Sequence, residues 1–183
     1  MIKKIKAPFT KELAKTLKAG DQILLSGVIY TARDAAHARM VREFQAGKPF
    51  PFDLKGQAIY YAGPCPAKPG DVIGSCGPTT AGRMDAYTPF LLDHGLGVMI
   101  GKGGRNAAVI EAMKRNTAVY FGAVGGAGAL IAQSIKKAEV VAYADLGTEA
   151  IRRLEVKDLP LVVLIDCDGN DLYKIGQAAY QKI

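Results

Sequence analysis

Apolar and polar positions along the chain follow two different periods. Short apolar runs rich in β-branched and aromatic residues predict strands, because such runs suit a sheet that is covered on both faces. Segments with apolar residues three or four apart predict helices. We expect strands at 22–30, 58–63, 97–101, 118–124, 139–146 and 159–166, and helical segments at 31–46, 83–94, 104–115, 125–137 and 148–153.

Residues at the ends of these segments refine the prediction. Residues 1–20 indicate a short strand and then a helix, for which Thr10 is a suitable N-cap. Thr31 is a suitable N-cap for the following helix, with Asp34 as the acidic half of a capping box. A turn signal just before residues 171–174 predicts that this segment returns as a hairpin strand.

The order of these elements indicates the fold class. Strands that alternate with helices are typical of α/β proteins. The chain has no internal repeat and no linker composition, and 183 residues suit one domain with a sizeable core. We therefore expect a single α/β domain over residues 1–183. Residues 64–82, rich in proline and glycine, form a long loop of the kind that often binds ligands.

Charge narrows the classes of function. Lys and Arg total 24 against 17 Asp and Glu, which gives a formal net charge of +7. Such a balance suits nucleic acid, a membrane surface or an acidic substrate. No basic stripe alternates with aromatic residues, which argues against a nucleic-acid partner. The start of the chain lacks the apolar stretch of a signal peptide, and no apolar run is long enough for a membrane span, so no membrane association is expected.

The three cysteines, Cys65, Cys76 and Cys167, are odd in number and irregularly spaced. This pattern argues against a disulfide framework and favours a reducing compartment, so we expect a cytoplasmic location. No pair forms a CxxC motif, and the spacing does not indicate that this chain holds a metal cluster.

A first cluster of candidate residues follows the predicted strand 22–30. Arg33 falls in the first turn of the next helix, and His37 lies one turn later on the same face. A helix N-terminus attracts anions, and a guanidinium group binds a carboxylate through two parallel hydrogen bonds. The pattern therefore fits a carboxylate site. It equally fits an ordinary capped helix with Arg33 and His37 on its surface.

Two further clusters lie in glycine-rich loops. Thr79 and Thr80 precede Arg83 and Asp85, and this arrangement suits either an anion-binding loop or the cap of the next helix. Lys102 stands between glycines directly after the strand 97–101, where ligands bind in open α/β sheets, although a plain surface turn would look the same.

The glycine-rich segment 122–128 lacks both a GxGxxG pattern and a phosphate-loop lysine, so tight packing, or backbone N–H groups that face a shared site, explains it better than nucleotide binding. Together the three clusters supply two arginines, one lysine and two threonines without a phosphate motif. Several fixed cations of this kind suit a substrate with two carboxylates.

Four long strings carry a resemblance to a known family. They are SGVIYTARDAAH at 26–37, GPCPAKPGDVIGSCGPTTAGRMD at 63–85, GKGG at 101–104 and AVYFGAVGGAGALIAQSIK at 118–136. They resemble the β subunit of class I fumarate hydratase and the similar β subunit of L-tartrate dehydratase. The resemblance covers nearly the whole chain and implies a swivelling β/β/α domain.

The resemblance also implies a cofactor and a partner. The family's [4Fe–4S] cluster is held by three cysteines of the other subunit, so neither Cys65 nor Cys76 is expected to be a metal ligand. The implied enzyme is a heterotetramer of two α and two β chains that adds water reversibly to fumarate, giving L-malate. The open iron of the cluster acts as a Lewis acid on substrate oxygens.

Roles for individual residues follow from the same resemblance. Arg33 and Arg83 are implied to bind carboxylate oxygens, with Lys102 as a further cationic contact and Thr80 as a further substrate-binding residue. Thr79 corresponds to the family's proposed base, and the acid belongs to the partner chain. From placement alone, we hypothesise that the supporting residues Asp34 and Asp85 orient the arginines and that His37 lines the site.

Alternatives of three classes remain open on the sequence alone. L-Tartrate dehydratase would carry out the same elimination on L-tartrate, giving oxaloacetate, and a related hydratase would act on a methylated fumarate. A non-enzymatic anion- or nucleotide-binding module comes from a different class and would draw on the glycine-rich segment 122–128. A nucleic-acid binder is the third, and its affinity would fall steeply with salt.

Overall fold

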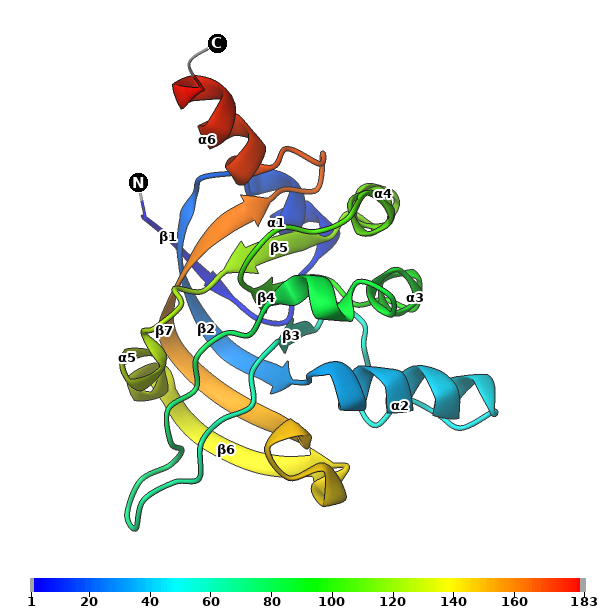
Figure 1. The fold of residues 1–183 in the computed structure, drawn as a ribbon, viewed down its shortest axis with the longest axis vertical. Helices are drawn as coiled ribbons and strands as arrows, with labels where there is room; N and C mark the ends of the chain where they lie inside the picture. The colour runs from blue at the N-terminus through cyan, green and yellow to red at the C-terminus, as the bar shows by residue number, and fades with distance from the viewer. Residues whose placement is uncertain (1, 182–183) are drawn as a thin grey trace.

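The computed structural model describes residues 2–181 (Figure 1), so Met1 and residues 182–183 of the predicted 1–183 domain lie outside it. The strands are β1 Ile2–Lys6, β2 Gln22–Thr31, β3 Ala58–Tyr60, β4 Val98–Gly101, β5 Val119–Gly122, β6 Ile135–Ala142 and β7 Ile151–Ile165. The helices are α1 Lys11–Thr16, α2 Asp34–Gln45, α3 Thr88–Asp93, α4 Ala107–Asn116, α5 Gly128–Ser134 and α6 Leu172–Tyr180, with 3₁₀ segments η1 Ala81–Met84 and η2 Ala144–Glu149. The mixed sheet with its helices confirms the predicted α/β class.

The strands form a sheet that closes on itself. β2, β3, β4 and β5 pair in parallel in that order. β7 then pairs antiparallel with β5 and also with β2, which completes the ring. β1 and β6 extend the sheet outside this ring, along β2 and β7. Closure leaves the short strands β3, β4 and β5 without a free edge, where unpaired backbone groups would be costly.

Alternate residues of the central strands enter two separate cores. Tyr60 and Phe121 belong to the core inside the ring. Their neighbours Ile59 and Tyr120 belong to the core under the helices. Successive side chains of a strand point to opposite faces, and here both faces are covered, so the strands read as unbroken apolar runs. Figure 1 shows α2, α3 and α4 on one side of the strands, where they cover the second core.

The N-terminal elements agree with the sequence prediction. β1 precedes α1, and the Thr10 hydroxyl caps this helix by accepting a hydrogen bond from the Leu13 amide. The predicted strands 22–30, 97–101 and 118–124 correspond to β2, β4 and β5. The predicted strand 58–63 is shorter, because the chain leaves the sheet after Tyr60. The predicted helix 83–94 is divided into η1 and α3.

The C-terminal third differs most from the prediction. The predicted helix 148–153 overlaps the 3₁₀ segment η2 only at residues 148–149, because β7 begins at Ile151 and runs for 15 residues. Ile151 and Leu154 have helical spacing, but they lie in opposite cores of a strand buried on both faces. β6 likewise begins at Ile135, four residues before the predicted strand. The predicted hairpin strand 171–174 is wrong, because Asp171 caps α6 by accepting from the Tyr173 amide.

No helix among residues 2–181 combines the length and the apolar character that crossing a membrane requires.

Candidate functional site

Four parallel strands end at one edge of the sheet. Thr31, the last residue of β2, is in register with Tyr60 of β3, and the ends of β4 and β5 meet at Gly101 and Gly122. The segments that follow these strands begin side by side. Ligands in open α/β sheets bind beyond the carboxyl ends of the strands. This edge therefore brings the first and third sequence clusters to the same place.

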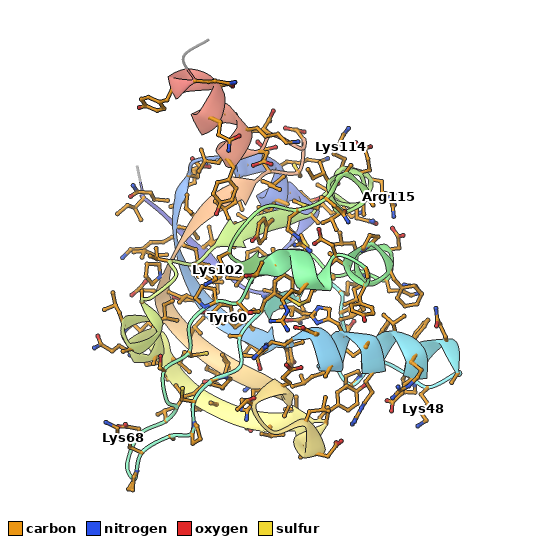
Figure 2. All side chains as sticks on the ribbon, in the orientation of Figure 1. Lys48, Tyr60, Lys68, Lys102, Lys114 and Arg115 are labelled. Atoms are coloured by element: carbon orange, nitrogen blue, oxygen red, sulfur yellow. The ribbon has the colours of Figure 1, made fainter. Side chains whose placement is uncertain are left out.

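The second cluster joins them through backbone hydrogen bonds. The Thr79 amide donates to the Tyr61 carbonyl oxygen at 2.7 Å. The Lys102 amide donates to the Thr79 carbonyl at 3.3 Å, and the Ala81 amide donates to the Lys102 carbonyl at 2.9 Å. Thr79, Thr80 and Lys102 are therefore neighbours. Figure 2 labels Lys102 beside η1, near the middle of the molecule.

Each candidate arginine forms an ion pair with a carboxylate from another segment. Arg83 Nη2 lies 2.5 Å from Asp34 Oδ2, so the second cluster is joined to the start of α2. Arg33 Nη2 lies 3.3 Å from Glu149 Oε1 of η2. Asp34 is thus in contact with Arg83, and its role in orienting that arginine stays a prediction. The side chain of Arg83 is 52% exposed, and both Thr80 and Lys102 are exposed, so the site is an open edge.

The start of α2 is capped differently from the prediction. Thr31 is the last residue of β2, and its hydroxyl accepts from the Arg152 amide of β7 at 3.1 Å. The helix begins at Asp34, and Glu149 caps it by accepting from the Ala35 amide at 3.0 Å. The predicted capping box is therefore wrong. The capping group is instead the Glu149 carboxylate of η2, which lies 114 residues away in sequence.

Three buried polar atoms at this helix start have no partner among the described residues: Arg33 Nε, Asp34 Oδ1 and His37 Nε2. A buried polar atom without a hydrogen bond is unfavourable, and such atoms are often paired by a ligand or water. Arg33 also passes close to the loop after β3, since a Cβ at Gly63 would lie 3.0 Å from its Nη1. Within residues 2–181, the first cluster thus keeps buried hydrogen-bonding groups available for a ligand or water.

His37 belongs to α2, and its side chain is fully buried. The alternative that places it on the helix surface is therefore wrong. Its Nδ1 lies 2.8 Å from the Arg33 carbonyl oxygen, which only accepts, so Nδ1 carries the proton. Burial, together with the nearby charge of Arg105, lowers the pKa of His37 from 6.5 to about 4, although the hydrogen bond to the Arg33 carbonyl acts in the opposite direction. The ring is therefore neutral near pH 7, with Nε2 as a bare acceptor.

Asp85 does not form an ion pair with either candidate arginine. Its Oδ1 lies 2.7 Å from Nε of Arg105, and its Oδ2 accepts from the Asn106 amide at 2.7 Å, just before α4. Arg105 is a residue that the sequence interpretation missed. The sequence contained one weak signal, a lone arginine directly after the GKGG string, but nothing indicated that it would be buried.

The glycine-rich segment 122–128 packs against the loop that leads to Thr79. A Cβ at Gly128 would clash with Ser75 Oγ and would lie 2.9 Å from the Gly77 amide nitrogen. A Cβ at Gly125 would lie 3.6 Å from Lys102 Nζ. The segment therefore permits close approach of two backbones and of the Lys102 side chain, in agreement with the tight packing inferred from the sequence.

Replacing Gly128 with alanine is expected to lower the free energy of unfolding by about 1–3 kcal/mol, because the new methyl group overpacks the contact with Ser75 and Gly77. Urea unfolding measures the effect. The matched control is Gly176→Ala in α6, where a Cβ meets nothing within 4 Å. A Gly128→Ala chain as stable as the control would contradict the close approach.

The cysteines do not suit an iron–sulfur cluster held by this chain alone. Cys65 is exposed, whereas Cys76 and Cys167 are buried. Burial raises the pKa of Cys76 to about 12, and iron–sulfur clusters are held by thiolates. Among residues 2–181, no group of three or more His, Cys, Asp or Glu side chains is placed to hold a metal ion.

Comparison with known proteins places this geometry in a family. The family described as the fumarase C-terminus matches residues 2–176. The chain is 44% identical over 155 residues to the anaerobic class I fumarate hydratase of Escherichia coli K12, covering 84% of this chain and 28% of that protein. It is 40% identical over 156 residues to fumarate hydratase 2 of Leishmania major, again covering 84% and 28%.

Another relative matches this chain over most of the length of both proteins. Over 181 residues the chain is 39% identical to a Methanocaldococcus jannaschii protein named "Putative L(+)-tartrate dehydratase subunit beta", covering 95% of this chain and 93% of that protein. By contrast, the chain spans only 28% of the length of each of the two fumarate hydratases. All of these names denote hydro-lyases. Since the family match runs from β1 into α6 and includes all three sequence clusters, this chain belongs to the fumarase C-terminus family.

Proposed function

We propose that this chain is the β subunit of a two-chain hydro-lyase that reversibly hydrates fumarate to L-malate. The observation that carries the proposal is the gathering of Arg33, Arg83 and Lys102, with Thr79 and Thr80, at one open edge of the sheet. Three cations on separate segments suit the two carboxylates of a C4 acid. Family membership supports the reaction class.

The residue types suit the chemistry of hydration and dehydration. Loss of a proton next to a carboxylate builds negative charge on that carboxylate. Arginines fixed in advance stabilise this charge more strongly in the transition state than in the ground state. Arg33 has the better fixed position of the two, since its side chain is only 22% exposed. We assign carboxylate binding to Arg33, Arg83, Lys102 and Thr80.

Thr79 is the candidate base in this proposal. Its backbone is fixed on both sides by the bonds to Tyr61 and Lys102. A threonine hydroxyl is a weak base unless a neighbour polarises it. We propose Lys102 for this role, because its backbone amide is bonded to the Thr79 carbonyl and an ammonium group beside the hydroxyl would favour the ionised form.

The proposal requires a partner chain. Class I fumarate hydratases generally depend on an iron–sulfur cluster, and the cysteines described above do not fit one. We therefore assign the [4Fe–4S] cluster and the catalytic acid to an α subunit, in an assembly of two α and two β chains. When bound, the cluster supplies a Lewis acid for substrate oxygens. The exposed edge around Thr80 and Arg83 is the surface that this partner would cover.

L-Tartrate dehydratase is the second candidate, and the specific observation in its favour is the end-to-end match to the M. jannaschii protein. Its substrate has one hydroxyl more than L-malate but the same two carboxylates, so this chain would use the same cations. A nucleotide-binding module is less well supported, because Gly128 is buried against Ser75 and Gly77.

The test is reconstitution. This chain is co-expressed with its candidate α chain, loaded with iron and sulfide without oxygen, and assayed on fumarate, L-tartrate and a methylated fumarate. We expect activity only in the mixture, with fumarate preferred. Activity of this chain alone would overturn the division of labour, and preference for L-tartrate would replace the first function by the second. A loaded complex inactive on all three acids would contradict both.

A further inference from the structure

We propose that the buried pair Arg105–Asp85 is a positioning device that holds the loops carrying Arg83 and Lys102 in the arrangement needed to bind a dicarboxylate. The inference rests on the proposed function; it adds Arg105 and gives Asp85 a role that does not require contact with Arg83. Arg105 lies three positions after Lys102, and Asp85 two positions after Arg83.

Arg105 cannot itself contact a ligand at the open edge, because its side chain is 0% exposed. Instead it is surrounded by partners from three other segments. Its Nε donates to Asp85 Oδ1 at 2.7 Å, its Nη2 to Thr88 Oγ1 at 2.9 Å and its Nη1 to the Tyr61 hydroxyl at 3.4 Å. The planar guanidinium, with its five donors in a fixed fork, is suited to such a junction.

Hydrogen bonds of this buried network hold the backbone of the loop that carries Arg83. The Asp85 amide donates to the Gly82 carbonyl at 3.2 Å, which closes η1 around Arg83. The Thr88 hydroxyl donates to the Met84 carbonyl at 2.9 Å and accepts from Arg105. The backbone on the C-terminal side of Arg83 is thereby tied to one buried cation.

The loop with Lys102 is tied to the same junction. The Tyr120 hydroxyl donates to the Gly103 carbonyl at 3.0 Å, and the Arg105 guanidinium lies over the Tyr120 ring, 5.0 Å from its centroid. The second oxygen of Asp85 holds the Asn106 amide. Glycines at 101, 103 and 104 give this loop little stiffness of its own, so these buried contacts hold Lys102 in place together with its backbone hydrogen bonds to Thr79 and Ala81.

The choice of residues argues for a role beyond stability. Taking a charge pair out of water is unfavourable, and well-packed apolar residues often stabilise a core equally well. An ion pair with directional bonds instead selects one arrangement of the segments that it joins. The surface pair Arg115–Asp93 also connects α4 with α3, but its side chains are 50% and 42% exposed and lie away from both loops.

The test uses the reconstituted two-chain enzyme and the double variant Asp85→Leu/Arg105→Met, which leaves no unpaired buried charge. We expect a melting temperature close to that of the wild type. We expect kcat/KM to fall roughly tenfold to 10²-fold, with weaker binding of the unreactive dicarboxylate succinate. The control is the double variant Asp93→Asn/Arg115→Gln, which should leave the melting temperature, kcat/KM and succinate binding unchanged. Wild-type kcat/KM in the double variant would refute the positioning role.

A second comparison separates positioning from mere structural support. In an Arg83→Met background, the same double variant should cost clearly less activity than in the wild type, because the device acts through Arg83. Fully additive losses would overturn the inference.

Amide hydrogen exchange of the β chain alone keeps the inference testable if the complex proves inactive. Residues 79–85 and 101–105 should then exchange faster in the double variant, with α6 unchanged. Unchanged exchange in both loops would refute the positioning role, whereas inactivity of the wild-type complex would refute only the proposed function.

Discussion

Replacing Arg83 with methionine is expected to lower kcat/KM of the reconstituted enzyme roughly 10²-fold or more, because the variant loses a fixed cation that faces the charge of the transition state. Arg83 is half exposed, and exposed ion pairs contribute little to stability, so the chain should remain folded. Methionine keeps the unbranched apolar stem of the side chain. The loss should therefore report on charge and hydrogen bonding rather than on packing.

The control for this variant is Arg42→Met. Arg42 lies in the last turn of α2, exposed, at the opposite end of the helix from Asp34. Steady-state kinetics with fumarate should give wild-type values for this control. A fully active Arg83→Met enzyme would remove Arg83 from the site.

Asp34→Asn adds a second level to the test. If Asp34 acts by holding Arg83 through the 2.5 Å contact, its effect should largely disappear in the Arg83→Met background. Equal losses in both backgrounds would show that Asp34 acts independently of Arg83.

Acidification from pH 7 to pH 4 is expected to destabilise the wild-type chain more than a His37→Gln chain, by about 3 kcal/mol at the end of the range. Burial lowers the pKa of His37 from 6.5 to about 4. Below pH 6.5 the unfolded chain takes up a proton at this histidine, while the folded chain does not until pH 4. Stability contributed by the neutral ring is therefore complete above pH 6.5 and is lost as the pH falls toward 4.

Urea unfolding of both chains at several pH values measures this difference. Carboxylates paired in the folded state, such as Asp93 beside Arg115, also lose stability in acid, but they do so equally in both chains. His94→Gln is the matched control, because the exposed His94 makes the same kind of Nδ1 contact, to the Phe90 carbonyl at 2.7 Å. Parallel stability curves for the wild type and His37→Gln would contradict the buried neutral state of His37.

Local patterns determined much of this protein. The apolar runs located β2, β4 and β5, and the Thr10 cap of α1 was predicted because its hydrogen bond spans only three residues. Arg33, Thr79 and Lys102 were selected because they follow strand ends or lie in glycine-rich loops. Parallel strands end at a common edge, so such residues meet whatever the details of the fold. Their roles remain predictions.

Tertiary structure decided the remainder, and the reason is sequence distance. β7 pairs with β2 across more than a hundred residues, and burial on both of its faces hides the strand period that would have revealed it. Three further features depend on contacts between distant segments. Glu149 rather than Thr31 caps α2, His37 is buried, and Asp85 pairs with Arg105. Whether a polar side chain faces solvent or a buried partner is set by what packs over it, and no local period of the sequence encodes that.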